Sequence, residues 1–184
     1  MTEPDPKGDA PSDSELITRW RAGDQRAATE IVARHAPALA RFATASGAGA
    51  DAEELVQDTF VRAFGALDTF RGDSSLRTWL FTIERRLLLD RRRAERRRGA
   101  DVELDEGHLT TSDDPLEAVV AGESRDRLRV AVERLSPTQR EVFTLRVGEG
   151  LSYKEIAAAV GTTEGAARVH YHNAMRTIKE FLDD

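Results

Sequence analysis

The side chains best suited to recognising a chemical partner lie on a helical pattern near the C-terminus, residues 164–182. At 100° per residue, Ala167, Tyr171, Ala174, Ile178 and Phe181 form an apolar stripe. The other side of the pattern presents Val169, His172, Asn173 and Arg176, flanked by Arg168. Asparagine can pair with adenine, arginine can reach guanine or phosphate, and valine can contact the thymine methyl. A solvated amphipathic helix has the same pattern, so this face alone leaves two interpretations open.

The residues in front of that helix favour nucleic-acid binding. Ser152 and Glu155 have the spacing of a capping box, which starts a short helix. Gly161 then stands where the chain must turn, and Thr162 or Thr163 can cap the helix that follows. This arrangement predicts a helix-turn-helix, a unit that places its second helix in the major groove of DNA.

Catalytic and metal chemistry find little support in the sequence. His170 and His172 are two residues apart, about 200° around a helix, so they cannot chelate one metal. His35 and His108 have no partners at ligand spacing, and the chain has no cysteine. There is also no glycine-rich phosphate loop and no nucleophile motif. We therefore expect no enzyme activity, no metal, no cofactor and no small-molecule substrate.

Composition and charge suggest a cytoplasmic protein of two domains. The chain has 184 residues, 40% of them hydrophobic, with no stretch long enough to span a membrane and no signal peptide. The net charge of −6 is unevenly distributed. Residues 84–98 contain eight arginines and three acids, whereas 99–123 is acidic and interrupted by glycine and proline.

This distribution predicts four segments: a disordered tail (1–12), a first domain (13–98), a flexible acidic linker (99–123) and a second domain (124–184). Both domains are expected to be all-α, since no alternating strand pattern occurs. In the first domain, we expect helices that start near Ser12, Asp24, Asp51 and Leu76. Pro37 should bend the second of these helices or mark a local irregularity in it. Their expected inward residues include Leu55, Val56, Thr59, Phe60 and Phe64 in the third helix, and Leu76, Trp79, Leu80, Ile83 and Leu87 in the fourth.

Three stretches of the sequence, taken in order, resemble a known family. They are DAEELVQDTFVRAF, then FRGDSSLRTWLFTIERRLLLDRRR, and, after the acidic segment, LSPTQREVFTLRVGEGLSYKEIAAAVGTTEGAARVHYHNAMRTIKEFL. This order resembles bacterial RNA polymerase sigma factors of the extracytoplasmic-function group, which are sigma-70-like. The resemblance covers residues 13–98 and 124–182 and implies two helical domains, region 2 and region 4. It implies a transcription initiation factor that binds core RNA polymerase and promoter DNA.

The resemblance also implies roles for particular residues. The helix over 51–64 would dock on a coiled coil of the polymerase through Glu53, Glu54, Gln57, Asp58 and Arg62. A solvated acidic face is the alternative interpretation. The −10 promoter element would be bound by a loop and the basic helix after it, through Phe70, Arg71, Asp73, Ser74, Ser75, Arg77, Arg85, Arg86, Arg91 and Arg92. Trp79 is more simply explained as a core residue than as a stacking platform.

The second domain would read the −35 element through the helix-turn-helix. The expected contacts are Thr162, Thr163, Arg168, Val169, His172, Asn173 and Arg176. Here the chain departs from many relatives, which carry arginines at the positions of His170, Asn173 and Met175. Arg86 also stands where relatives often carry asparagine, so the base preferences at both elements stay open.

Partners and alternative functions complete the expectations. An anti-sigma protein, often membrane-bound in this family, is expected as a third partner. The acidic linker could mimic nucleic-acid charge in the RNA path of the polymerase, or it could simply keep the segment soluble. A stand-alone helix-turn-helix regulator is the alternative function, although no heptad seam for dimerisation is evident. A helical adaptor that binds only protein is a further alternative.

Overall fold

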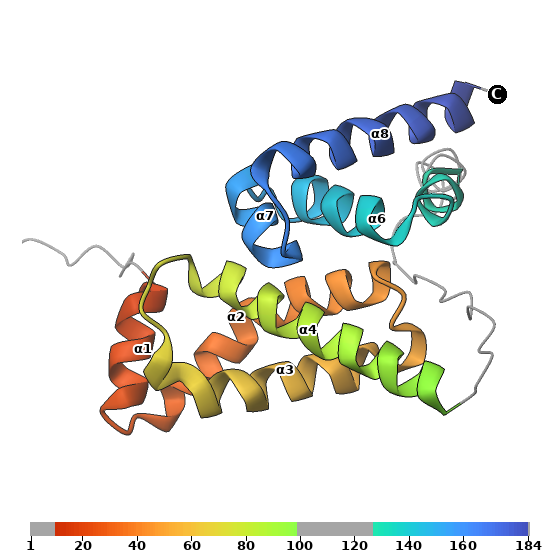
Figure 1. Cartoon of the computed structure of the whole chain (residues 1–184). Helices are drawn as coiled ribbons and strands as arrows, with labels where there is room; N and C mark the ends of the chain where they lie inside the picture. The colour runs from red at the N-terminus through yellow and green to blue at the C-terminus, as the bar shows by residue number, and fades with distance from the viewer. Residues whose placement is uncertain (1–9, 99–126, 184) are drawn as a thin grey trace, which may run out of the picture.

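The structure is a computed structural model that describes residues 10–98 and 127–183, and these residues form helices and turns without any strand. Two helical bodies lie one above the other (Figure 1). The N-terminal body contains α1 (Asp13–Arg21), α2 (Gln25–Ala45), α3 (Ala52–Ala66) and α4 (Leu76–Arg97). The C-terminal body contains a helical stretch at 127–133, then α6 (Pro137–Phe143), α7 (Tyr153–Val160) and α8 (Glu164–Asp183). The all-α prediction is confirmed for the described residues.

Two predicted segments fall largely outside this description. The acidic linker (99–123) lies entirely outside the described residues, as do residues 1–9 of the predicted tail. Residues 10–12, the last of that tail, are described, and Ser12 caps α1. Its Oγ accepts a hydrogen bond from the Glu15 amide, while the Glu15 carboxylate accepts one from the Ser12 amide at 2.6 Å.

Local sequence signals start the other helices of the N-terminal body. Asp24 caps α2 by accepting from the Arg26 amide at 2.9 Å, and Ser75 caps α4 through the Thr78 amide at 3.1 Å. Pro37 lies inside α2, which continues through it. The third helix differs slightly from the prediction: a 3₁₀ turn, Gly49–Asp51, leads into α3, and the Asp51 side chain makes no capping bond.

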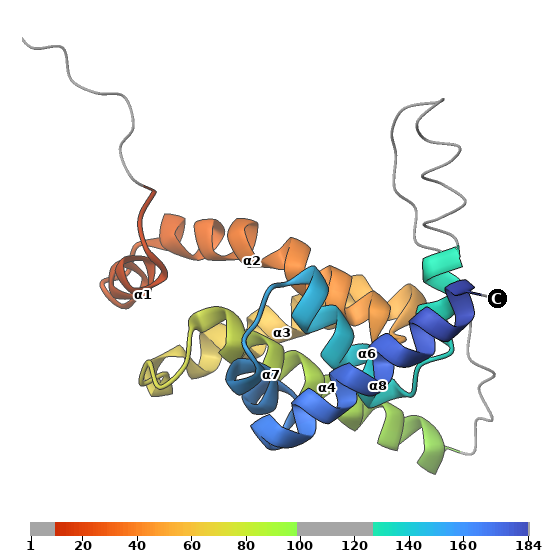
Figure 2. The same ribbon diagram turned by 90° about the horizontal axis from the view of Figure 1, so that it is seen from above.

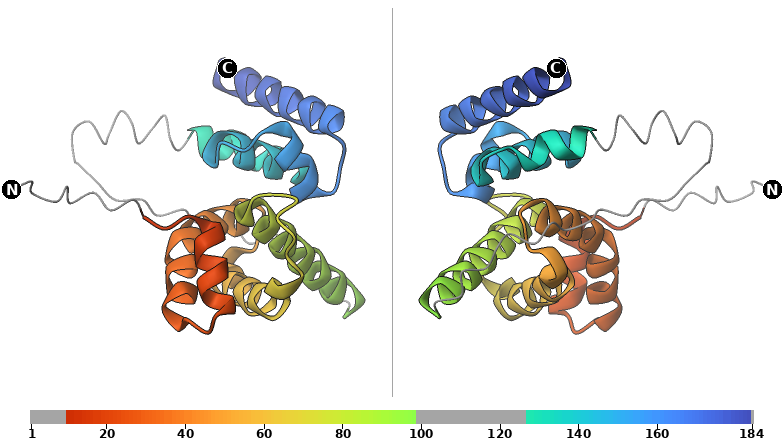
Figure 3. Two further views of the ribbon diagram at one scale, coloured as in Figure 1. Left: turned by 90° about the vertical axis from the view of Figure 1, so that its left-hand side faces the viewer. Right: turned by 90° about the vertical axis from the view of Figure 1, so that its right-hand side faces the viewer.

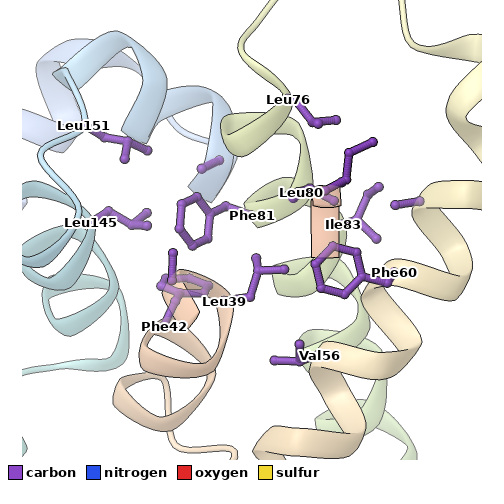
Figure 4. Close-up of a cluster of buried hydrophobic side chains, with 14 of the residues drawn as sticks. Leu39, Phe42, Val56, Phe60, Leu76, Leu80, Phe81, Ile83, Leu145 and Leu151 are labelled. Atoms are coloured by element: carbon purple, nitrogen blue, oxygen red, sulfur yellow. The ribbon is translucent and has the colours of Figure 1, made fainter. Parts of the chain in front are cut away.

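The core of the N-terminal body lies where α4 packs against α3 and α2. Leu80 and Ile83 of α4 face Phe60 and Val56 of α3 (Figure 4). Three residues predicted to point inward are only half-buried, namely Phe64, Trp79 and Leu87. They lie at the margin of the helix bundle, where aromatic pairs such as Trp20–Phe64 cover the core.

The C-terminal body is built around contacts of α8 with α6 and α7. A capping box of Ser136 and Gln139 starts α6, and a π-helical turn, η3 (Thr144–Gly148), extends it. The Leu151 amide closes this turn by donating to the Leu145 carbonyl at 3.0 Å, with Gly150 at φ +69°. The short connection that follows leads directly into α7.

The two bodies pack against each other rather than lying apart. In the view from above, α6, α7 and α8 lie over α2 and α4, and the two side views show the same stacking (Figures 2 and 3). One continuous cluster of buried apolar residues includes Phe42 and Phe81 of the N-terminal body and Leu145 and Leu151 of the C-terminal body (Figure 4). The predicted two-domain chain is therefore folded here as a closed unit.

Candidate nucleic-acid and protein interfaces

The helix-turn-helix has the local geometry that its sequence predicts. Ser152 and Glu155 form the expected capping box, with the Ser152 amide donating to the Glu155 carboxylate at 2.8 Å. These hydrogen bonds from Ser152 hold the pKa of the Glu155 carboxyl below its usual range. Gly161 ends α7 in the left-handed region at φ +67°. Of the two candidate caps for α8, Thr163 is the one used, since its Oγ1 accepts from the Ala166 amide at 3.1 Å.

The outer face of α8 carries the predicted base-reading residues. Val169 is 58% exposed, although it is apolar, and His172 and Arg176 are exposed as well. Arg168 donates to Glu164 at 2.6 Å and lies over the Tyr153 ring. A shallow hollow brings together four of the seven predicted contacts, since it is lined by Tyr153, Arg168, Val169, Tyr171, His172 and Asn173; Thr162, Thr163 and Arg176 lie outside its lining. The apolar stripe faces inward, with Ala167, Ala174 and Ile178 buried and Tyr171 and Phe181 half-buried.

The outer face of α3 is exposed to solvent. All five predicted polymerase-binding residues, Glu53, Glu54, Gln57, Asp58 and Arg62, are exposed. Sequence reasoning missed Val61, which lies between them in the sequence and is 74% exposed. Its place on the exposed side of the helical wheel was the signal that could have found it. A single exposed apolar side chain is common on protein surfaces, so Val61 does not by itself define a binding site.

In the segment between α3 and α4, some residues are exposed to solvent and others make contacts that hold the fold together. It begins with the 3₁₀ turn η2 (Leu67–Thr69), whose Leu67 carbonyl accepts a hydrogen bond from Arg21 at 2.9 Å. Phe70 packs on Trp79 with ring centroids 5.0 Å apart. Arg71 and Asp73 are exposed and Ser74 is half-exposed. Ser75 is engaged as the cap of α4.

Most of the predicted DNA-binding arginines of α4 are already paired within the chain. Arg91 donates to Asp58 at 2.6 Å and to Glu54 at 3.2 Å, and Arg92 donates to the Ser46 carbonyl. Arg86 differs, because it is exposed and has no ion pair among the described residues. Arg77 and Arg85 contact the C-terminal body, as described next.

Two buried glutamates of the C-terminal body hold arginines of the N-terminal body. Glu149, which follows η3, accepts from Arg41 Nε at 2.8 Å and also pairs with Arg77. The bond to Glu149 raises the pKa of the Arg41 guanidinium. Glu141 of α6 accepts from Arg85 Nε at 2.7 Å. The sequence analysis named neither glutamate, and contacts 56 to 108 residues apart in sequence leave no local pattern that could reveal them.

A third glutamate is buried without any ion pair. Glu84 of α4 is fully buried, and neither of its carboxylate oxygens has a hydrogen-bond partner. Burial alone raises the pKa of Glu84 to about 9, so the carboxyl is protonated at neutral pH. Its i±4 neighbours Leu80 and Leu88 are buried too, and this spacing could have shown that Glu84 points inward.

Comparisons with known proteins agree with this architecture. Sigma-70 region 2 matches residues 31–98, and Sigma-70 region 4 matches residues 125–178. The ECF RNA polymerase sigma-E factors of Salmonella typhimurium and Escherichia coli are each 32% identical over 176 residues, covering 91% of this chain and 92% of theirs.

Solved structures give the same result. CnrH, in complex with the cytosolic domain of CnrY, is 30% identical with a TM-score of 0.69 and covers 93% of this chain and 97% of its own. RpoE from Bartonella quintana, in complex with the anti-sigma factor NepR, is 28% identical with a TM-score of 0.69. That match covers 84% of this chain and 96% of RpoE.

The two modules in this order define the class of sigma-70-like transcription initiation factors. Within that class, the chain belongs to the extracytoplasmic-function (ECF) sigma factors. It directs core RNA polymerase to promoters, as the sequence analysis predicts, and the alternative of a stand-alone regulator is not favoured. No helix in the described part of the chain is long and apolar enough to cross a membrane.

Proposed function

We propose that this ECF sigma factor divides its work between a region 2 domain (13–98) and a region 4 domain (124–184), joined by the acidic linker (99–123). In this assignment α3 docks on core RNA polymerase, the segment 70–75 with α4 binds the −10 element, and α8 reads the −35 element. The supporting observation is that the outer faces of α3 and α8 are both exposed and on different bodies of the chain. One molecule can then contact polymerase and DNA at the same time.

The docking proposal is tested by changing α3 without disturbing its packing. Gln57 and Arg62 are exposed, and neither side chain makes a hydrogen bond to another described residue. We expect Gln57→Ala with Arg62→Ala to weaken core binding at least tenfold while the unfolding curve stays unchanged. The matched control is Gln25→Ala with Arg26→Ala, which removes the same side chains from the exposed first turn of α2. Equal core binding by both double variants would overturn the docking assignment.

The −10 proposal rests on charge, since neutralising phosphate supplies most of the affinity for DNA. Arg86 is the most direct probe, because its side chain is exposed on α4. We expect Arg86→Ala to slow open-complex formation, to leave core binding intact and to lower the salt dependence by about one phosphate contact. The same measurements on Arg85→Ala and Arg91→Ala extend the test to two arginines with ion pairs in the free protein. Normal promoter melting by all three would contradict the assignment.

The −35 proposal assigns base reading to Val169 and Asn173 of α8. We expect Asn173→Ala to change the preferred −35 sequence at one position, at a cost of about 1–3 kcal/mol in discrimination. Selection from a promoter library randomised at the −35 element measures this directly. Lys179→Ala, on the exposed side of the same helix but nearer its end, is the control. An unchanged preference in the Asn173 variant would remove this residue from the reading face.

We also infer the setting in which this factor works. RNA synthesis belongs to the core polymerase, so the chain acts without catalysing a reaction. The bacterial chromosome and polymerase lie in the cytoplasm, which is where the factor must function. The solved RpoE of Bartonella quintana is bound to an anti-sigma factor, which supports an anti-sigma partner for this chain. Affinity capture with the tagged full chain, followed by reconstitution of the pair, tests that inference.

A further inference from the structure

Helices α7 and α8 meet through a pair of aromatic rings. Tyr153, the first residue of α7, packs against Tyr171 of α8 with ring centroids 5.9 Å apart and an interplanar angle of 65°. An edge-to-face pair of this kind is a favoured aromatic geometry. Tyr153 also lines the hollow that contains Arg168, Val169 and Asn173. Its side chain therefore contributes to the surface of α8 from the neighbouring helix.

Two guanidinium groups lie over the Tyr153 ring. The Cζ of Arg168 is 4.7 Å from the ring centroid, and the Cζ of Arg146, in η3, is 4.9 Å from it. A cation within about 6 Å of an aromatic centroid is attracted by the negative face of the ring. Arg146 is anchored separately, because its Nη1 donates to the Leu151 carbonyl at 2.8 Å. Arg146 and Tyr171 thus fix the ring, and the fixed ring supports Arg168.

Arg168 needs this support because most of its side chain is in water. The Arg168 side chain is 59% exposed, and that of its charged partner Glu164 is 49% exposed. Their bond is short, at 2.6 Å, but exposed ion pairs one helical turn apart contribute little. A long arginine side chain loses rotamer entropy when it is fixed. A ring that restricts Arg168 before a ligand arrives lowers this entropic cost of binding.

The ring restricts Arg168 without using its hydrogen-bond donors. Within residues 10–98 and 127–183, the Arg168 guanidinium donates from Nη2 to Glu164, whereas Nε and Nη1 donate to no residue. A DNA phosphate offers the acceptors that such a group prefers, and arginine–phosphate contacts fix the register of a protein on DNA. Arg176 differs, because it lies over no ring in the described part of the chain and is 3.9 Å from Glu180.

We propose that Tyr153 is a positioning residue for the −35 element, and that its ring orients Arg168 toward a phosphate beside the bases read by Val169 and Asn173. Tyr153 acts through its ring rather than through its hydroxyl. This inference rests on the proposed −35 role of α8. Because phosphate contacts carry no sequence information directly, Tyr153 sets the affinity for every −35 sequence and leaves the preferred bases unchanged.

Four variants of the full chain separate the ring from the hydroxyl and from Arg168. Tyr153→Phe keeps the ring, and Tyr153→Leu removes it but keeps an apolar side chain. Arg168→Ala is made alone and in combination with Tyr153→Leu. The matched control is Phe181→Leu, which removes an aromatic ring near the other end of α8, where the Arg134 Cζ is 4.4 Å from the ring centroid.

The probe is duplex DNA that carries both elements of a promoter mapped by run-off transcription. Each variant is assembled with core RNA polymerase, and binding is measured over a range of salt concentrations. We expect Tyr153→Phe and the Phe181→Leu control to bind like the wild type. We expect Tyr153→Leu to bind about three- to tenfold more weakly, as for the loss of one cation–π contact. Its salt dependence should fall by about one phosphate contact.

The combined variant distinguishes positioning from stability. Tyr153→Leu should add no further loss to Arg168→Ala, because the ring acts through that arginine. A folding defect caused by Tyr153→Leu would instead weaken binding in either background. Selection from a library randomised at the −35 element should return the wild-type sequence preference for Tyr153→Leu.

Weaker binding by Tyr153→Phe would overturn the proposal, because it would assign the contact to the hydroxyl. Unchanged binding by Tyr153→Leu or by Arg168→Ala would overturn it as well, and so would additive losses in the combined variant or an equal loss in the control. The function itself is judged separately, by transcription with the wild-type chain. If discrete start sites appear and Tyr153→Leu behaves like the wild type, only the positioning role is wrong. If no start sites appear with the wild type, the proposed function is at fault.

Discussion

Replacing Glu84 by glutamine should stabilise the protein at neutral pH, and the gain should grow as pH rises. The carboxyl is fully buried, has no hydrogen-bond partner and has a folded-state pKa of about 9. In the unfolded chain the same group has its ordinary pKa, 4.5. Above that value the unfolded state releases the proton while the folded state keeps it, so stability falls as pH rises and levels off near the folded pKa.

The magnitude follows from the two pKa values. Each pH unit between them costs 1.36 kcal/mol, so moving from pH 5 to pH 7.5 should lower the free energy of unfolding by about 3 kcal/mol. Glutamine has nearly the same shape and does not titrate, which removes this term. Glu84→Gln should therefore match the wild type near pH 4.5 and exceed it increasingly above that pH.

The assay uses the tryptophans of the chain. Both of them, Trp20 and Trp79, lie in the N-terminal body, so their fluorescence reports the unfolding of the domain that contains Glu84. Urea unfolding curves at pH 5, 6, 7 and 8 would give the pH dependence for each variant. Glu95→Gln, near the exposed end of the same helix, is the control. Parallel pH profiles for the wild type and Glu84→Gln would refute the reasoning.

Two predictions concern the turn chemistry of the C-terminal body. Ser152→Ala removes the cap of α7 and should cost about 1 kcal/mol of stability, visible as a lower melting temperature; an unchanged value would show that the capping box adds nothing. Gly161→Ala puts a side chain at φ +67° and should cost about 1–2 kcal/mol. Gly161→Asn should lose less, because asparagine tolerates that conformation, and equal losses would contradict this explanation.

Signals that depend on neighbouring residues could be predicted from the sequence. Ser12, Asp24 and Ser152 each start a helix through bonds to amides two or three residues away, so residue type and spacing determined the helix starts. The apolar stripe of α8 could be predicted for a similar reason, because its apolar residues recur in the sequence with the period of a helix. The exposed faces of α3 and α8 are the complements of such stripes.

Contacts between distant segments could not be predicted in this way. Phe81 has the pattern of a core residue, but nothing local says that it faces the C-terminal body. In the sequence, Glu141 and Glu149 have no feature that distinguishes them from surface acids. Only the fold places Glu141 beside Arg85 and Glu149 beside Arg41. The sequence likewise predicts Arg77 as a DNA contact without revealing that it pairs with Glu149 of the C-terminal body.

The measurement that tests the central claim most directly is run-off transcription with core RNA polymerase and the purified full chain on a library of genomic fragments. The account predicts discrete start sites that depend on the added chain, that share two promoter elements, and that are lost with Gln57→Ala and Arg62→Ala. Core polymerase that binds the chain tightly but starts at no new site, or does not bind it at all, would contradict the account.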